Sequence, residues 1–357
     1  MQHNSTPTTA SVIRRVSVLL LAASAALFGA AAPVSAADTT APTAPDASAE
    51  GAGPLSVYWA TAVDDDDVTA YRVFRNGRQI ATVPADANSY HDHALTGNTW
   101  YTYGVQAVDA AGNTSPTTTL QPLKSAPLLR FPADRDDRVE GVLEASRPVL
   151  VDFATDRLPK CRSRYAGGDA WSINVEYRVD GGPVQSQPAT RLNDDRRQVT
   201  ALAPLSLPLG ARNLELWFVS GDITGCTEYD SRFGANYRYT IEQPTVVSFN
   251  ADWSESLTGQ VRKDQTLTVR YDVARLPQCR ETLRGMPGWH IDVFYRLDDG
   301  PTLAKRLTDH DGEALPATID LQPSTSRVEI WFRVYGQVSR CTAYDSDHGR
   351  NYIYQTV

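Results

Sequence analysis

Hydrophobic and polar residues alternate with a period of two along most of the chain after residue 54. In residues 171–179 the odd positions are Trp, Ile, Val, Tyr and Val, and the positions between them are Ser, Asn, Glu and Arg. Residues 289–297 follow the same pattern. Successive side chains of a β-strand point to opposite faces, so this alternation predicts strands with one buried face. Because no segment shows helical periodicity, we expect an all-β fold.

The second half of the chain contains the same domain twice. LPKCR at 158–162 recurs 118 positions later as LPQCR at 276–280. YDSRFGANY at 229–237 recurs 115 positions later as YDSDHGRNY at 344–352. Two nearly constant offsets that differ by a few residues indicate a duplication with one short deletion. We expect repeat 1 over residues 127–242 and repeat 2 over 245–357, each a β-sandwich of roughly eight short strands.

Residues 55–124 predict a further run of short strands. Leu55, Val57 and Trp59 alternate with Ser56 and Tyr58. The pair Asn76-Gly77 is a strong signal for a hairpin turn between two strands. The preceding residues 37–54 are rich in Ala, Pro, Thr and Gly, which predicts a linker.

This segment resembles bacterial fibronectin type III domains. The resemblance rests on Trp59, on YRVFRNG at 71–77, on Leu95 six residues before Tyr101, and on VQAVDAAGNTSP at 105–116. It implies a seven-stranded sandwich with Tyr101 as the tyrosine corner. It also implies a spacer role beside catalytic or sugar-binding modules. The chain is thus expected to hold three tandem β-sandwiches.

The first 36 residues have the pattern of a secretory signal peptide. Arg14 and Arg15 precede an apolar stretch over 16–32, and Val34-Ser35-Ala36 offers a cleavage site near Ala36. No later apolar run reaches 18 residues, so no membrane span is expected. The formal net charge is −8 and no basic stripe is present, which argues against nucleic acid and anionic membrane as partners. We expect a secreted, extracellular monomer.

Four cysteines in an exported chain predict disulfides. Of the three possible connectivities, the repeat favours the one that keeps each bridge within its own copy. It pairs Cys161 with Cys226 and Cys279 with Cys341. The alternative is a zinc site, which needs closely spaced Cys or Cys/His pairs, and the chain has none.

The repeated YDSxxGxNY motif has two interpretations. Gly234 and Gly349 suit a tight turn between two strands, which would make the motif structural. An aromatic ring with an amide nearby also suits sugar recognition, because the ring stacks on a pyranose and the amide bonds its hydroxyls.

The motif resembles the final strand of starch-binding modules, which end in an aromatic-Asp-Asn-Asn-x-x-x-Asn-Tyr stretch. The residues matched at equal spacing are Tyr229, Asp230, Asn236 and Tyr237 in repeat 1, and Tyr344, Asp345, Asn351 and Tyr352 in repeat 2. The resemblance implies that these residues form the ligand site. The paired asparagines after Asp are absent here. The LPxCR and YDSxxGxNY landmarks also resemble an uncharacterised family of bacterial secreted domains, which implies no function.

Four tryptophans recur at matching places in the two copies. Trp217 and Trp331 lie opposite a Leu/Phe face, so we include them as candidate sugar-binding residues. Trp171 and Trp289 share a face with Ile, Val and Tyr and are expected to pack in the core. The arginine of each LPxCR segment is expected to bond a nearby carboxylate or carbonyl.

Enzymatic motifs are missing, and no histidine is shared between the copies: His290 corresponds to Ser172, and His348 to Phe233. The acidic run Asp64–Asp67 is a possible cation site, but a solvated loop is the simpler interpretation. We therefore expect a non-catalytic protein that binds polysaccharide or cell-surface glycan, with an α-glucan as one candidate, and needs no cofactor or metal. The alternatives are a protein–protein adhesion module and an unrecognised or accessory polysaccharide hydrolase.

Overall fold

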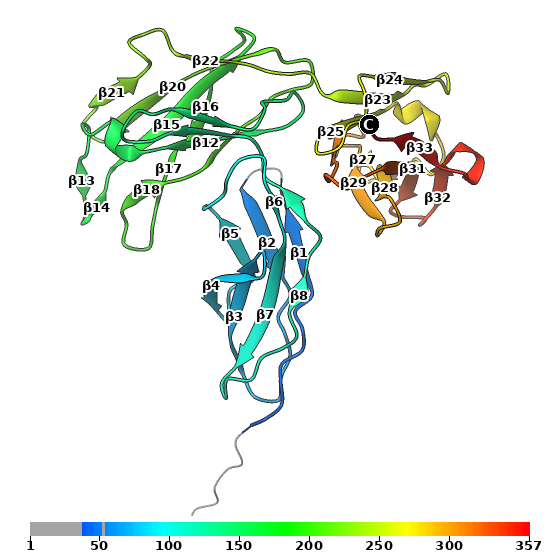
Figure 1. Cartoon of the computed structure of the whole chain (residues 1–357), viewed down its shortest axis with the longest axis horizontal. Coiled ribbons are helices and arrows are strands. Elements are labelled where there is room, and N and C mark those ends of the chain that lie inside the picture. Colours follow the sequence, from blue (N-terminus) through cyan, green and yellow to red (C-terminus); the bar gives the residue numbers. More distant parts are fainter. Residues whose placement is uncertain (1–37, 52–53) are drawn as a thin grey trace, which may run out of the picture. The chain divides into compact units, whose positions relative to one another are not determined.

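The computed structural model describes residues 38–51 and 54–357, so the predicted signal peptide lies outside the described residues. The described chain is built from short strands in small sheets (Figure 1). Its helices are single 3₁₀ turns, η1 (Thr155–Arg157), η2 (Val273–Arg275) and η3 (Asp347–Gly349). The predicted all-β class is confirmed. Within these ranges no helix has the length and apolar character needed to cross a bilayer.

The N-terminal strands form a sandwich of a three-stranded sheet, β1-β2-β5, and a four-stranded sheet, β4-β3-β7-β8. The strands are β1 (Ala47–Glu50), β2 (Leu55–Trp59), β3 (Val68–Arg75), β4 (Arg78–Pro84), β5 (Ser89–Asp92), β6 (Trp100–Tyr101), β7 (Tyr103–Asp109), β8 (Thr118–Thr119) and β9 (Leu123–Lys124). The hydroxyl of Tyr101 accepts a hydrogen bond from the backbone N–H of Thr96 at 2.8 Å, as a tyrosine corner does.

The structure differs from the predicted linker at β1. This strand pairs with β2 and lies inside residues 37–54, which the composition assigned to a linker. Ala47 and Ala49 pack against the core of the N-terminal sandwich. Side chains this small bury little apolar surface, so the strand has only a weak hydrophobic signal.

Repeat 1 is a sandwich of a four-stranded sheet, β11-β10-β12-β19, and a five-stranded sheet, β16-β15-β20-β21, in which β22 also pairs with β20. The strands are β10 (Leu128–Phe131), β11 (Arg138–Glu140), β12 (Val149–Phe153), β13 (Arg164–Tyr165), β14 (Gly168–Asp169), β15 (Trp171–Val179), β16 (Gln185–Pro188), β17 (Thr190–Leu192), β18 (Gln198–Thr200), β19 (Ala203–Leu205), β20 (Asn213–Asp222), β21 (Thr227–Asp230) and β22 (Tyr237–Thr240).

Repeat 2 has the same strand order, with sheets β24-β23-β25-β30 and β29-β28-β31-β32, and β33 pairs with β31. Its strands are β23 (Thr245–Phe249), β24 (Glu255–Thr258), β25 (Thr266–Tyr271), β26 (Thr282–Leu283), β27 (Met286–Pro287), β28 (Trp289–Leu297), β29 (Leu303–Arg306), β30 (Ala317–Asp320), β31 (Arg327–Gly336), β32 (Thr342–Asp345) and β33 (Tyr352–Gln355). The two main sheets have the same topology in both repeats, so the sequence repeat is a structural repeat.

The inner faces of the two sheets form a separate hydrophobic core in each repeat. In β20, Leu214, Leu216 and Phe218 are almost completely buried, and Glu215 and Trp217 point to the outer face. The predicted division of this strand into two faces is confirmed.

The predicted disulfides are present. Cys161 and Cys226 bridge with their Cα atoms 5.2 Å apart, and Cys279 and Cys341 with theirs 5.3 Å apart. Each bridge ties the loop after a 3₁₀ turn to the tip of the β20–β21 or the β31–β32 hairpin.

The short deletion inferred from the offsets lies in one hairpin. In repeat 1, β17 and β18 pair from Thr190↔Thr200 to Leu192↔Gln198. In repeat 2 the matching contact is a single bridge between Thr308 and Ala314. Nine residues separate the first pair and five separate the second, which changes the offset from 118 to 114. One extra residue before Cys341, in the turn between β31 and β32, then gives the offset of 115.

Candidate functional site

Two residues of the YDSxxGxNY motif in repeat 1 are buried around an arginine. Arg157 of η1 donates from Nε to Asp230 Oδ2 at 2.8 Å and from Nη2 to the hydroxyl of Tyr237 at 2.8 Å. The Tyr237 hydroxyl donates to Asp230 Oδ1 at 2.6 Å. Arg157 also bonds Asp137. The side chains of Arg157, Asp230 and Tyr237 are each at least nine-tenths buried. Asp230 and Tyr237 are therefore placed to hold the fold and not to contact a ligand.

Repeat 2 has the same buried network. Arg275 of η2 donates from Nε to Asp345 Oδ2 at 2.8 Å and from Nη2 to Tyr352 Oη at 2.8 Å. Tyr271 adds a hydrogen bond to Asp345 at 3.0 Å. Burial raises the pKa of Tyr352, and its hydrogen bond to Asp345 raises it further. The predicted ligand residues Asp345 and Tyr352 thus have the same structural role.

The motif asparagines join the turn to the outer face of the five-stranded sheet. Asn236 donates from Nδ2 to Glu215 Oε1 at 2.7 Å, and Asn351 donates in the same way to Glu329 at 2.7 Å. Glu215 also accepts two hydrogen bonds from Arg178, at 2.9 and 3.1 Å. These bonds from Arg178 and then Asn236 lower the pKa of Glu215 to about 2. Each asparagine therefore anchors a turn beside the exposed aromatics.

The first tyrosine of each motif is exposed. Tyr229 pairs with Val219 in β20 and is 61% exposed, and Tyr344 pairs with Arg333 in β31 and is 58% exposed. Their partly exposed neighbours Trp217 and Trp331 lie two residues along the central strand, on the same outer face. The structure thus brings together the Tyr and Trp predicted as ligand-binding residues. We name these pairs the Trp217–Tyr229 platform and the Trp331–Tyr344 platform.

The two platforms differ in what surrounds the tryptophan. Trp331 lies parallel to Phe294, with ring centroids 5.8 Å apart and an interplanar angle of 16°. Arg333 then covers Phe294, with Cζ 4.7 Å from the ring centroid. In repeat 1, Glu176 takes the place opposite Trp217, and no ring or guanidinium of a described residue stacks on this tryptophan. Both tryptophans are partly exposed, and among the described residues only Trp331 of the two is stacked on a second ring.

The tryptophans expected in the core are half-buried at its edge. Trp171 and Trp289 pack against the cores of their repeats. Arg162 lies over Trp171 at 3.5 Å and donates to the carbonyl oxygens of Thr155 and Leu158, each at 2.5 Å. The LPxCR arginine therefore bonds carbonyls, one of the two partners expected.

Four residues of these sites were not predicted from the sequence: Arg157, Arg275, Glu215 and Glu329. A signal was available, because each recurs at the repeat offset: Arg precedes LPxCR in both copies, and Glu occupies the same place in LELWF and VEIWF. The sequence does not show, however, that Arg157 meets Asp230 across 73 residues.

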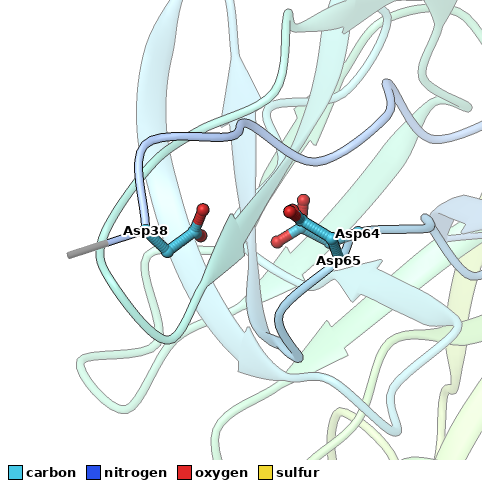
Figure 2. A group of neighbouring side chains, drawn as sticks. All are labelled: Asp38, Asp64 and Asp65. Atoms are coloured by element: carbon cyan, nitrogen blue, oxygen red, sulfur yellow. The ribbon is translucent and has the colours of Figure 1, made fainter. Parts of the chain in front are cut away.

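The acidic run in the N-terminal sandwich lies on the loop between β2 and β3. Figure 2 shows Asp64 and Asp65, and Asp65 accepts a hydrogen bond from Thr40 Oγ1 at 3.2 Å. Asp65, Asp66 and Asp67 are exposed. Acidic groups on an exposed loop do not define a cation site, so we assign no metal here.

Residues 124–357 match the model of DUF6209, a family of unknown function, and the chain belongs to this family. Its matches to enzymes are short relative to those enzymes. An α-amylase of Niallia circulans is 41% identical over 229 residues, which cover 63% of this chain and 14% of the amylase. Exoglucanase B of Cellulomonas fimi is 41% identical over 81 residues, 22% of this chain and 7% of that enzyme. Chitinase C of Streptomyces lividans is 39% identical over 77 residues, which cover 22% of this chain and 12% of that enzyme. The matched parts are similar to fibronectin type III domains.

Proposed function

We propose that this member of the DUF6209 family is an exported, non-catalytic protein that binds polysaccharide through the outer sheet faces of its two repeats. The observation that carries the proposal is the pair of exposed tyrosines, Tyr229 and Tyr344, beside Trp217 and Trp331. In both repeats the next motif residue, Asp230 or Asp345, is buried. The exposed tyrosine is therefore not part of the buried network that holds the turn.

Exposed aromatic rings are costly in water and suited to sugars. A pyranose presents a face of C–H groups that packs on an aromatic ring, while its hydroxyls need polar partners at the edge. The anchored Glu215 and Asn236 lie beside Trp217, and Glu329 and Asn351 beside Trp331. Each platform therefore combines a stacking surface with polar groups held in fixed positions.

The relatives support a role beside polysaccharide-degrading enzymes. Three of them are an α-amylase, an exoglucanase and a chitinase, and their matched segments are accessory in type. For the glycan itself we propose an α-glucan, because the motif is similar to the last strand of starch-binding modules. Two sites on one chain raise retention on a polymer when both can engage it.

The test is retention of the full-length protein, after export, on insoluble starch, chitin, cellulose and peptidoglycan. Changing Tyr229→Ala or Tyr344→Ala should each weaken binding by about 1–2 kcal/mol, because a stacking ring and its buried area are lost. The double variant should no longer be retained. Tyr165→Ala is the matched control, since Tyr165 is 70% exposed and lies on β13, outside both platforms.

The outcomes separate the parts of the proposal. Retention on chitin or cellulose but not on starch contradicts only the α-glucan assignment and still supports polysaccharide binding. Full retention of the folded double variant contradicts the platforms as the site. Failure of the unaltered protein to bind any of the four polymers contradicts glycan binding and favours a protein–protein adhesion role.

A further inference from the structure

The four-residue difference between the β17–β18 hairpin and its counterpart changes the surface beside it. In repeat 1 the longer hairpin docks on the β13–β14 hairpin. Arg196 donates to the carbonyl of Ala166 at 2.9 Å and accepts at its own carbonyl from the N–H of Asp169 at 2.9 Å. The carboxylate of Asp169 accepts from Arg197 at 3.1 Å and from the N–H of Gln198 at 2.9 Å. The two hairpins are therefore closed against each other.

In repeat 2 this closure is missing for two reasons. The shortened loop 309–313 has no residues equivalent to the docking arginines. At the position of Asp169 stands Pro287, which has neither an N–H group nor a carboxylate. The loop instead folds against Trp289, where a Cβ added to Gly312 would lie 3.0 Å from the indole ring.

The space left between the β26–β27 hairpin and the shortened loop is a groove of about 540 Å³. This volume falls within the range of small-ligand sites, roughly 300–1,000 Å³. We name it the Trp289 groove. Its lining includes Arg284, Met286, Pro287, Trp289, Arg306 and Asp309.

The groove combines an apolar surface with free cationic donors. Trp289 is half-buried at the groove, with the Arg280 guanidinium 4.5 Å from its ring centroid, and Met286 is 55% exposed. Arg284, at the turn of the β26–β27 hairpin, forms no hydrogen bond or ion pair with any residue in the described ranges. Arg306 bonds Asp292 through Nε at 2.9 Å, and its terminal nitrogens have no described partner. Exposed apolar surface beside two guanidinium groups suits a ligand that carries both an apolar face and an anionic group.

Two acidic groups near the groove, Asp309 in its lining and Asp292, accept hydrogen bonds. The Oδ1 atom of Asp309 accepts from the N–H groups of Asp311 and Glu313 at 2.9 Å each, which shapes the loop. Asp292 accepts from both Arg306 and Arg333. His290, on the same face as Asp292, has its pKa lowered by burial, and its Nε2 lies 3.3 Å from Asp292 Oδ2. Repeat 1 has Ala166 and Pro188 in place of Arg284 and Arg306, so the cationic donors belong to repeat 2 alone.

We propose that the Trp289 groove is a binding site for an acidic saccharide, one that carries carboxylate or sulfate groups. The guanidinium groups of Arg284 and Arg306 bind the oxyanions through charge-assisted hydrogen bonds. Met286 and the part of Trp289 that Arg280 does not cover contact the apolar face of the sugar ring. This site is independent of the two platforms, and it gives repeat 2 a specificity that repeat 1 does not have.

The test is calorimetric titration of the whole protein with three oligosaccharides of equal length: an oligogalacturonate, a sulfated malto-oligosaccharide and the neutral malto-oligosaccharide. We expect binding of at least one acidic ligand that weakens as salt rises from 20 to 300 mM, because mobile ions screen the charges. Changing Arg284→Ala, which restores the repeat 1 residue, or Arg306→Gln should weaken it by roughly tenfold or more.

A loop exchange gives a second, geometric test. Replacing residues 309–313 by residues 191–199 of repeat 1, together with Pro287→Asp, should close the groove and abolish acidic binding. The Tyr229→Ala, Tyr344→Ala double variant should leave it unchanged, which separates this proposal from the platforms. Binding by the carboxylated ligand alone identifies a uronate site, and binding by the sulfated ligand alone a sulfate site.

Three results would overturn the proposal. They are no binding of either acidic ligand, equally tight binding of the neutral ligand, and acidic binding that is unchanged in both arginine variants. If the loop exchange does not fold, the arginine variants decide the question by themselves.

Discussion

At the scale of single residues, adjacent positions of the repeated motif have opposite environments. Tyr344 is 58% exposed, and Asp345, the next residue of β32, is 4% exposed. This follows from strand geometry, because neighbouring side chains point to opposite faces. The inward carboxylate then needs a partner, since an unpaired buried charge is very costly. Arg275 is that partner, and the motif therefore has one ring available to a ligand and one charge committed to the fold.

The two copies of the buried network should not be equally sensitive. Arg275 contacts one carboxylate, Asp345, but Arg157 contacts both Asp230 and Asp137. We expect Asp345→Asn to destabilise the protein by about 3–5 kcal/mol, because it leaves a buried guanidinium without a counter-charge. Asp230→Asn should cost less. Calorimetric unfolding of the whole chain measures both.

The neighbouring Tyr344→Ala change is the control for that comparison. A surface substitution of this kind should alter stability by no more than about 0.5 kcal/mol. Equal losses for Asp230→Asn and Asp345→Asn would show that Asp137 does not share the charge of Arg157.

At the scale of elements, each disulfide connects two segments that no strand pairing connects. Cys279 lies after η2, and Cys341 lies between β31 and β32, with a sequence separation of 62. Cross-linking a loop of this length restricts the unfolded chain and typically stabilises a domain by about 2–4 kcal/mol. We expect the double change Cys279→Ala, Cys341→Ala to lower stability by this amount, measured by urea unfolding in non-reducing buffer.

The matching change in repeat 1, Cys161→Ala with Cys226→Ala, should have an effect of similar size, because its sequence separation is 65. Peptide mapping of the unaltered protein without reductant checks the pairing directly. A peptide that links a cysteine of one repeat to the other would contradict it.

At the scale of the whole molecule, the duplication produced two sandwiches with separate cores. The core of repeat 2 draws its buried residues from Val247 to Tyr352, and that of repeat 1 from Leu129 to Ile241. A domain with its own core and its own disulfide has what it needs to fold alone. We therefore expect residues 245–357, produced in an oxidising host, to unfold in one cooperative transition, measured by circular dichroism.

Residues 127–242 are the matched control for this experiment, with the same topology and their own bridge. A repeat 2 fragment that forms its disulfide yet shows no cooperative transition would mean that repeat 2 depends on the rest of the chain for its stability.

The sequence by itself determined the all-β class, the two repeats, the disulfide pairing and the two faces of strands such as 214–218. These features depend on period-two alternation and on comparison of two copies, and both are local or internal to the chain. The sequence also identified Tyr229 and Trp217 as candidate ligand-binding residues, each on separate grounds. It missed β1, because Ala side chains contribute little to a hydrophobic pattern.

Only the tertiary structure decided which motif residues are available to a ligand. The strand alternation that separates Tyr229 from Asp230 is interrupted by the turn before Tyr237, so spacing alone could not assign its face. The partner of Asp230 comes from a 3₁₀ turn 73 residues earlier, and such a contact has no local signal. The Trp289 groove also depends on contacts between distant segments. In repeat 1 the β17–β18 hairpin contacts the β13–β14 hairpin, and in repeat 2 the loop that replaces it is four residues shorter and leaves a groove beside β26–β27.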